Sequence, residues 1–253
     1  MIRNYFVIAI RNLLRRKTNS IITILGLAVG LTCCILILTY ISYEFSYDRQ
    51  HARPDQIYRI LRETKSEDGI SRIVPEISGA IAETLKRDIP EVKQAIRMFK
   101  YRVGFQHQDQ LANLDFCLVD PGFFDAFNFP LLNGDPLIAL SQPASILLTE
   151  QAATRFFGSE NPIGKLIIVK DDLLYGEYQV TGIIKDIPPN SSIKFDFITT
   201  HMPSHFAKLL WEDWLPQAWR MTWVFVMLPE DVEVNKLREK LQNVRHCSLK
   251  PSA

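Results

Sequence analysis

The chain has 253 residues, a formal net charge of +1 at pH 7 and 23% charged residues. This balance is typical of an ordinary globular surface and argues against a basic patch large enough to bind nucleic acid. Hydrophobic residues make up 47% of the chain, and a long apolar run near the N-terminus raises the question of a membrane anchor.

Residues 1–17 form a basic N-terminal segment without any acidic residue. Ile2, Phe6 and Ile10 fall near one helical face, which favours a basic amphipathic helix lying on the inner membrane surface or against a cytoplasmic partner. The alternative is a charged flank that only sets the topology. The cations of this segment are Arg3, Arg11, Arg15, Arg16 and Lys17.

The next segment, from Thr18 to Tyr43, contains no charged residue. As a helix rising about 1.5 Å per residue, Ile21 to Ile41 reaches roughly 31 Å, close to the thickness of the bilayer hydrocarbon. A core helix normally has a polar face, and a signal peptide has only roughly 7–15 apolar residues. We therefore predict one uncleaved transmembrane helix over 18–43, with the cationic N-terminal side in the cytoplasm.

Two glycines inside this predicted helix are spaced four residues apart. Gly26 and Gly30 form a G-x-x-x-G pair, which lets another helix approach closely. Glycine is frequent in membrane helices, so the pair alone is weak evidence. It indicates a packing face for a second helix.

The remaining residues, 44–253, are expected to form an extracytoplasmic domain of mixed α and β structure. Strand–helix units flank a β-rich middle, which predicts an α+β domain with two lobes around separate cores. Ile81 and Leu85 should be buried on one helix, and Phe195 and Phe197 should point inward from one strand. We expect strands at 56–63, 70–74, 92–107, 111–119, 144–149, 165–169, 178–184, 193–199 and 221–228, and helices at 75–90, 150–158 and 231–244.

Smaller features of this domain leave alternatives open. Thr149 is expected to cap the helix that follows it, and Gly158 to end that helix. A short helix within 120–127 should present three phenylalanines between the lobes. The four tryptophans Trp211, Trp214, Trp219 and Trp223 fit either an interaction surface or a covered strand edge. Cys117 and Cys247 have a spacing that neither demands nor excludes a disulfide.

No catalytic, cofactor-binding or metal-binding constellation is expected. "GSENPIGKL" has five residues between its glycines and Leu166 after Lys165, so it fails as a phosphate-binding loop. His201 and His205 are four apart, but Pro203 lies between them and no further ligand completes a set. His51, His107 and His246 are isolated, and the acidic pairs Asp171–Asp172 and Glu212–Asp213 read as solvated loop charges.

Four stretches of the sequence resemble MacB/FtsX-type ABC transporter permeases. They are "NYFVIAIRNLLRRKTNSIITILGLAVGLTCCILILTYISYEFSYDRQH", "LVDPGFFDAFNFPLLNGDP", "SILLTEQAATRFFGSENPIGK" and "YQVTGIIKDIPPNSSIKFDF". They follow one another in the family's order, and the likeness as a whole extends over nearly all of residues 4–228. The resemblance implies a MacB-like periplasmic core domain between the first two spans of a four-span permease, with an ATPase subunit docked underneath.

From this resemblance follow a location and a set of partners. The chain should be a single-pass protein of the cell inner membrane whose domain binds substrate or a partner protein, or transmits ATPase-driven movement, without being an enzyme. Its partners would be the membrane, an ABC ATPase on the cytoplasmic side, and a second copy or another permease subunit. Arg11, Arg15, Arg16 and Lys17 would serve topology and coupling, and Gly26 and Gly30 helix packing.

The end of the chain departs from the family. No apolar run of membrane length follows residue 228, and the tail is "NVRHCSLKPSA". We therefore expect a chain truncated before the C-terminal permease module, whether naturally, by a frameshift or by design. A stand-alone single-pass sensor or adaptor is the alternative, and an anchored hydrolase is disfavoured.

Overall fold

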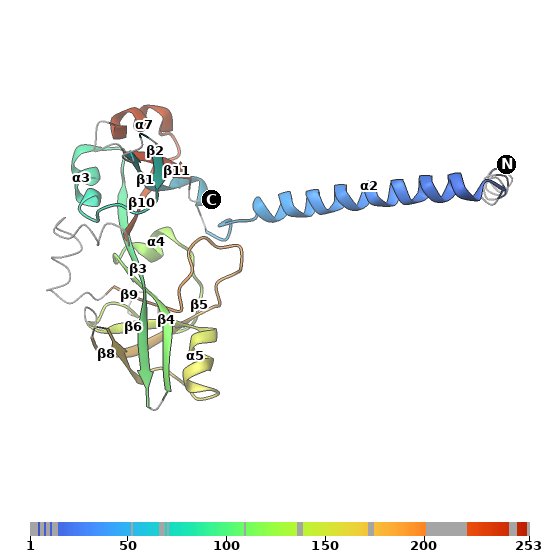
Figure 1. Ribbon diagram of the computed structural model, residues 1–253. Helices are drawn as coiled ribbons and strands as arrows, with labels where there is room; N and C mark the ends of the chain where they lie inside the picture. The colour runs from blue at the N-terminus through green and yellow to red at the C-terminus, as the bar shows by residue number, and fades with distance from the viewer. Residues whose placement is uncertain are drawn as a thin grey trace. The chain divides into compact units, whose positions relative to one another are not determined.

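The computed structural model describes residues 15–51, 53–65, 71–108, 110–135, 139–171, 175–200, 222–242 and 247–251, together with positions 5, 8, 11 and 69. It divides into two compact units, Met1–Tyr47 and Asp48–Ala253. His201, His205, Glu212, Asp213 and three of the tryptophans, all weighed in the sequence analysis, lie outside the described residues. Figure 1 shows the helices and strands of each unit.

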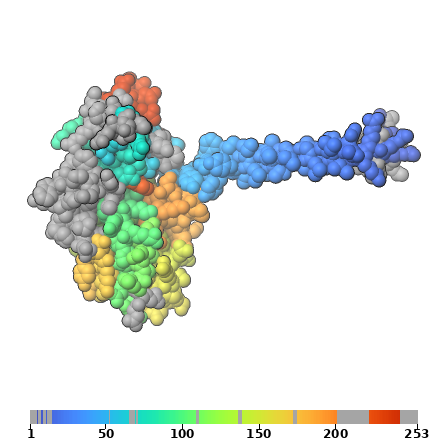
Figure 2. Space-filling model, viewed as in Figure 1, coloured from blue at the N-terminus to red at the C-terminus, as the bar shows by residue number. Residues whose placement is uncertain are grey.

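The first unit is built on α2 (Lys17–Glu44), a helix of 28 residues. Its mean hydropathy reaches 2.8, and none of its residues is buried, as the blue helix in Figure 2 illustrates. The hydroxyls of Thr23, Thr32 and Thr39 donate to the carbonyls four residues earlier, at 2.9, 2.8 and 2.5 Å. Their polar groups are therefore satisfied within the helix, as a lipid environment requires. The predicted helix is confirmed as long and apolar enough to cross a membrane.

The second unit is organised around one large sheet. The strand order is β11-β1-β10-β3-β4-β9-β6-β8-β5, with β2 paired to β1, and β7 paired to both β3 and β8. Pairs are antiparallel except β4–β9 and β6–β8. The strands are β1 (Ile57–Lys65), β2 (Ser71–Val74), β3 (Gln94–His107), β4 (Gln110–Val119), β5 (Leu131–Asn133), β6 (Ser145–Thr149), β7 (Leu166–Lys170), β8 (Gly176–Ile184), β9 (Phe197–Thr199), β10 (Thr222–Met227) and β11 (Cys247–Pro251).

Short helices accompany this sheet: η1 (Pro54–Gln56), α3 (Ile81–Asp88), α4 (Phe123–Ala126), α5 (Glu150–Phe157) and α7 (Val234–Gln242). The predicted cap of α5 is confirmed, because the Thr149 side chain accepts from the Ala152 N–H at 3.3 Å, and Gly158 ends the helix with φ of 60°. The predicted start of α3 near residue 75 is wrong. The Ile77 N–H donates to the Thr222 carbonyl of β10, which holds the preceding segment beside the sheet.

The sheet carries separate hydrophobic cores on its two faces, since side chains alternate along β3. Ala95 and Phe99 point to one face, and Ile96 and Met98 to the other. The first face holds two clusters. The α3 cluster comprises Ile60, Ile77, Ile81, Ala82, Leu85, Ile89, Val92, Ala95, Val224, Val226, Leu228, Leu237 and Leu241.

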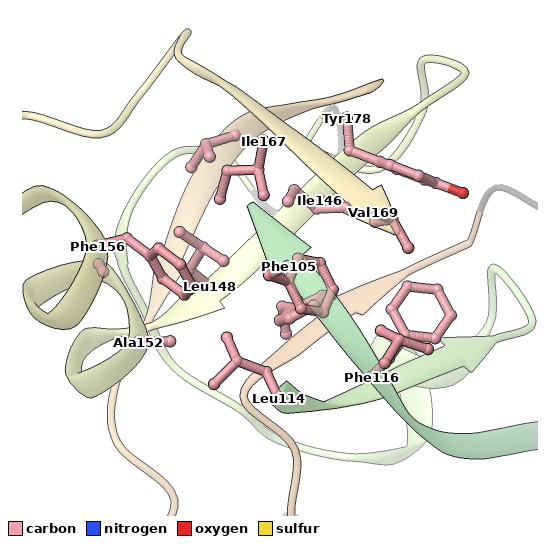
Figure 3. Packing of buried hydrophobic residues seen from close by; sticks show 14 of the residues in the cluster. Phe105, Leu114, Phe116, Ile146, Leu148, Ala152, Phe156, Ile167, Val169 and Tyr178 are labelled. Atoms are coloured by element: carbon pink, nitrogen blue, oxygen red, sulfur yellow. The ribbon is translucent and has the colours of Figure 1, made fainter. Parts of the chain in front are cut away.

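The second cluster on this face lies at the end of the sheet against α5. Figure 3 shows Phe105, Leu114 and Phe116 from β3 and β4 meeting Ile146 and Leu148 from β6. The α5 cluster comprises Phe99, Val103, Phe105, Leu114, Phe116, Leu118, Ile146, Leu148, Ala152, Ala153, Phe156, Phe157, Ile167, Val169, Tyr178, Val180, Ile183 and Phe197. The predicted pair of separate cores is confirmed on this face.

A salt bridge occupies the surface between these two clusters. Arg97 on β3 donates through Nη2 to Asp120 Oδ1 and through Nε to Asp120 Oδ2, each at 2.9 Å. Its backbone N–H also donates to Asp120 Oδ2 at 2.9 Å. The two side chains are 15% and 17% exposed. Arg97 lies on β3 between Ala95 of the α3 cluster and Phe99 of the α5 cluster, so this ion pair stands between the two apolar cores.

The opposite face holds a third core that the sequence did not predict. Phe195 and Phe197 were expected on one strand, but only Phe197 belongs to β9, and the two rings enter different clusters. The thiol of Cys117 is free and buried here, and burial raises its pKa. The Phe127 cluster comprises Ile57, Ile96, Met98, Cys117, Val119, Phe123, Ala126, Phe127, Phe129, Ala139, Leu147, Ile184, Ile193, Phe195, Ile198 and Phe225.

Candidate functional site

Asp48, the first residue of the second unit, is tied to a distant loop. Its backbone N–H donates to the Asn190 carbonyl at 3.1 Å, and its Oδ1 accepts from the Ser192 N–H at 2.8 Å. The Ser191 hydroxyl also lies 3.3 Å from that oxygen. Asp48 is only 3% exposed. Three hydrogen bonds thus fix the residue at which the chain enters the domain.

The backbone of Asp48 has an unusual conformation, with φ of 53°. Non-glycine residues rarely adopt a positive φ, and aspartate and asparagine are among the side chains that tolerate it best. A short side chain at this φ can turn its carboxylate toward neighbouring amides. Both the conformation and the hydrogen bonds therefore favour aspartate at this position.

The partner loop, residues 187–193, is itself held in a defined shape. The consecutive prolines Pro188 and Pro189 restrict its φ angles, and the Ser191 N–H donates back to the Pro188 carbonyl at 3.1 Å. The Ser191 hydroxyl accepts from Gln50 Nε2 at 3.0 Å and can donate to the Ile193 carbonyl at 3.0 Å. A stiff loop thus meets the entering chain.

His51 completes the contact from the entering chain. Its ring is 4% exposed and lies edge-on to the rings of Phe127 and Phe129, with centroid distances of 5.1 and 5.3 Å. Neither ring nitrogen has a hydrogen-bond partner within the described part of the chain. Burial lowers the pKa of the imidazole, and the Asp48 carboxylate opposes that shift. We call Asp48, Gln50 and His51, together with Ser191 and Ser192, the entry clip.

A cation lies close enough to the clip to act on it electrostatically. The Arg59 guanidinium packs over the Trp223 ring at 5.2 Å from its centroid. Burial lowers the pKa of Arg59, and the carboxylates of Glu76 and Asp48 oppose that shift. Trp223 on β10 packs at the edge of the hydrophobic core. For this tryptophan the structure therefore favours the covered strand edge over an interaction surface. The hydrogen bonds and ring contacts of the entry clip hold the segment 48–51 against the domain.

The residues predicted as sites belong to the first unit instead. Gly26 and Gly30 lie one turn apart on α2, and an added Cβ would meet no atom within 4 Å at either position. Their side of the helix has room for a close neighbour. Arg11, Arg15, Arg16 and Lys17 are all exposed at the N-terminal side of α2.

Two residues of the phosphate-loop-like stretch have structural roles in the described part of the chain. Gly158 of "GSENPIGKL" ends helix α5, and Lys165 of the same stretch forms an ion pair with Glu160. The described residues contain no group of three or more His, Cys, Asp or Glu that could hold a metal ion. His51 belongs to no such group in the described part of the chain, and its ring packs against Phe127 and Phe129, which lie far away in the sequence.

The match to a family model covers most of the chain. Residues 20–244 match the model of the MacB-like periplasmic core domain. A comparison with curated proteins found no match.

Three solved structures share the fold. A domain of a protein designated a permease from Porphyromonas gingivalis has a TM-score of 0.65 at 22% identity, covering 80% of this chain and 92% of that structure. The periplasmic region of MacB from Actinobacillus actinomycetemcomitans gives 0.54 at 16%, covering 78% and 89%. The extracellular domain of the noncanonic ABC-type transporter YknZ from Gram-positive bacteria gives 0.53 at 12%, covering 76% and 99%.

Proposed function

Because this chain belongs to the MacB-like periplasmic core domain family, we propose that it is a membrane-anchored permease subunit of an ABC transporter of the MacB/FtsX type. One observation carries the proposal. The apolar helix α2 ends at Glu44, and after Phe45, Ser46 and Tyr47 the chain is fixed by Asp48. A movement of the helix therefore reaches a hydrogen-bonded attachment point within a few residues.

The proposed role is the transmission of movement between the two sides of the membrane. Coupling requires an element whose position both ends can bias. The backbone N–H of Phe45 still donates to Ile41, and that of Ser46 to Tyr43, at 3.0 Å each. The helix thus continues as hydrogen-bonded turns toward Asp48. We infer that α2 acts as the lever and the entry clip as its attachment to the domain.

The proposed partners follow from the two ends of the helix. An ABC ATPase subunit would dock on the cytoplasmic side, near Arg11, Arg15, Arg16 and Lys17. A second copy of the chain, or another permease subunit, would pack on the face of Gly26 and Gly30, since small residues allow close helix contact. The proposed location is the cell inner membrane.

The proposed topology can be measured directly. A reporter fused after Ala253 is expected to be active only outside the cytoplasm, because the cations before Thr18 hold the N-terminus inside. Leu31→Arg should weaken insertion, since a central charge costs on the order of 3 kcal/mol on insertion scales. Leu31→Ala is the matched control and should insert normally. A reporter active only in the cytoplasm would refute the orientation.

The proposed dependence on partners can be tested in liposomes. The purified chain alone is expected to show neither ATP turnover nor ATP-dependent solute flux, because one span cannot enclose a pathway. With a cognate ABC ATPase and any further spans, turnover should appear and should fall in the Gly26→Leu/Gly30→Leu double variant. Energy transfer between labelled copies reports whether that variant lost helix packing. ATP-dependent flux by the chain alone would contradict the proposal, and assembly without any ATPase response would favour a sensor or adaptor.

A further inference from the structure

The imidazole of His51 is buried without the hydrogen bonds that a buried polar group normally makes. Its exposure is 4%, and both ring nitrogens lack a partner among the described residues. The rings of Phe127 and Phe129 meet it at interplanar angles of 81° and 67° and offer it no hydrogen-bond acceptor. A neutral imidazole tolerates such a site far better than an imidazolium does, because an unpaired charge loses its hydration there.

The charged groups near His51 offer little compensation for a proton. On its own segment, Asp48 is the carboxylate that acts on it, and this carboxylate already accepts hydrogen bonds from Ser191 and Ser192. The segment after α4 contributes the two phenylalanine rings, and β1 contributes Arg59, a cation that also interacts with Asp48. An added positive charge on His51 would therefore compete for one shared carboxylate.

We propose that His51 makes the entry clip acid-sensitive: the neutral ring stays between Phe127 and Phe129, and protonation expels it and loosens the segment from the loop of Ser191. The backbone supports this consequence, since the His51 N–H donates to the Asp48 carbonyl at 3.4 Å. A shift of the His51 backbone on expulsion of the ring would therefore act on the turn that contains Asp48. The device would respond to the acidity of the compartment in which the domain lies.

The direction of the effect follows from proton linkage. The pKa of His51 is lowered in the closed clip, mainly by burial, whereas an open clip restores the ordinary value of about 6.5. Between these two values the open form binds more protons. The closed clip is therefore fully favoured above about pH 6.5 and loses stability as the pH falls toward the lowered pKa. For each unit of difference between the His51 pKa of the closed and open forms, the population of the open form rises up to about tenfold. This corresponds to about 1.4 kcal/mol per unit.

Amide hydrogen exchange of the full chain in detergent or nanodiscs tests this proposal. The reporters are the backbone N–H groups of Asp48, His51, Ser191 and Ser192, each of which is a donor in or beside the clip. After correction for intrinsic exchange rates, their protection should fall between about pH 7.5 and 5, by up to about tenfold for each unit by which burial lowers the pKa of His51. His51→Phe, which fills the aromatic site without titrating, should abolish that loss.

A second histidine and a direct titration complete the design. His107 is only half-buried and lies outside the clip, with Nδ1 3.0 Å from the Leu166 carbonyl, so His107→Gln should keep the wild-type response. Imidazole NMR of the wild-type protein should give His51 a pKa below about 6.5, which decides the matter even where a variant fails to fold. Three outcomes would each overturn the proposal: unchanged protection of the wild-type protein on acidification, the same loss of protection in His51→Phe, or a His51 pKa at or above about 6.5. These measurements report on the clip itself and are independent of transport.

Discussion

Phe127→Ala is expected to lower the free energy of unfolding of the extracytoplasmic domain by about 3–5 kcal/mol, because a buried phenylalanine leaves both lost transfer energy and a cavity. The ring is 0% exposed. Its centroid lies 4.7 Å from that of Phe123 and 5.0 Å from that of Phe225. The substitution therefore removes the centre of the Phe127 cluster, and with it one wall of the His51 site.

Urea unfolding of the full chain, followed by tryptophan fluorescence, measures this loss. Trp223 packs against the same cluster and so reports on it. The midpoint should fall while the denaturant slope stays constant, which indicates lost stability without a changed unfolded state. Leu132→Ala is the control, since Leu132 is 51% exposed, and its effect should stay within about 0.5 kcal/mol. A loss below about 1 kcal/mol for Phe127→Ala would mean that the cluster repacks around the gap.

The elements that the sequence predicted well are those whose signals are local. Helix α2 follows from uninterrupted apolarity, and α5 from a capping threonine, a terminal glycine and helical spacing of apolar residues. The strand β6 was predicted at 144–149, and all five of its residues are buried. Such elements need no knowledge of distant partners, because hydrophobic periodicity and end signals lie within the segment.

The elements that the sequence missed depend on distant partners. β5 spans three residues, of which Leu132 and Asn133 are exposed, so it lacks an apolar pattern. β11 is a strand because it pairs with β1, five residue pairs in all, although "CSLKP" has little strand character. Tertiary context routinely overrides propensity in such cases.

The entry clip was missed for the same reason. Asp48 and Ser191 are 143 positions apart, and the sequence around either residue does not predict contact with the other. The motif "DPGFFDAF" gave a partial signal, since it predicted a short helix presenting phenylalanines. The close approach that orients it was not visible: a Cβ on Gly122 would lie 1.8 Å from Gln94 Nε2. The positions of single residues such as Asp48 and Gly122 determine this geometry, and the composition of the chain does not predict them.

Asp48→Ala is expected to destabilise the domain by about 2–5 kcal/mol, from two separate contributions. Alanine removes the acceptor of the Ser192 N–H, and a lost partner for a buried polar group costs about 1–3 kcal/mol. It also has to adopt φ of 53°, which adds roughly 1–2 kcal/mol for a residue with a Cβ and no polar compensation. The two contributions are separable, because other side chains at position 48 remove one without the other.

Three variants at position 48 make that separation. Asp48→Gly keeps the positive φ and loses only the acceptor, so it should fall between wild type and alanine. Asp48→Asn keeps both the acceptor and the tolerance for this φ, and it should lie within about 1 kcal/mol of wild type. Urea unfolding gives the stabilities, and hydrogen exchange at Ser191 and Ser192 shows whether the clip itself opens. The order alanine, glycine, asparagine, from most to least damaging, is the expected result. Asparagine as damaging as alanine would contradict this account, since it would place the holding force in the charge that Asp48 shares with Arg59 rather than in its hydrogen bonds and backbone.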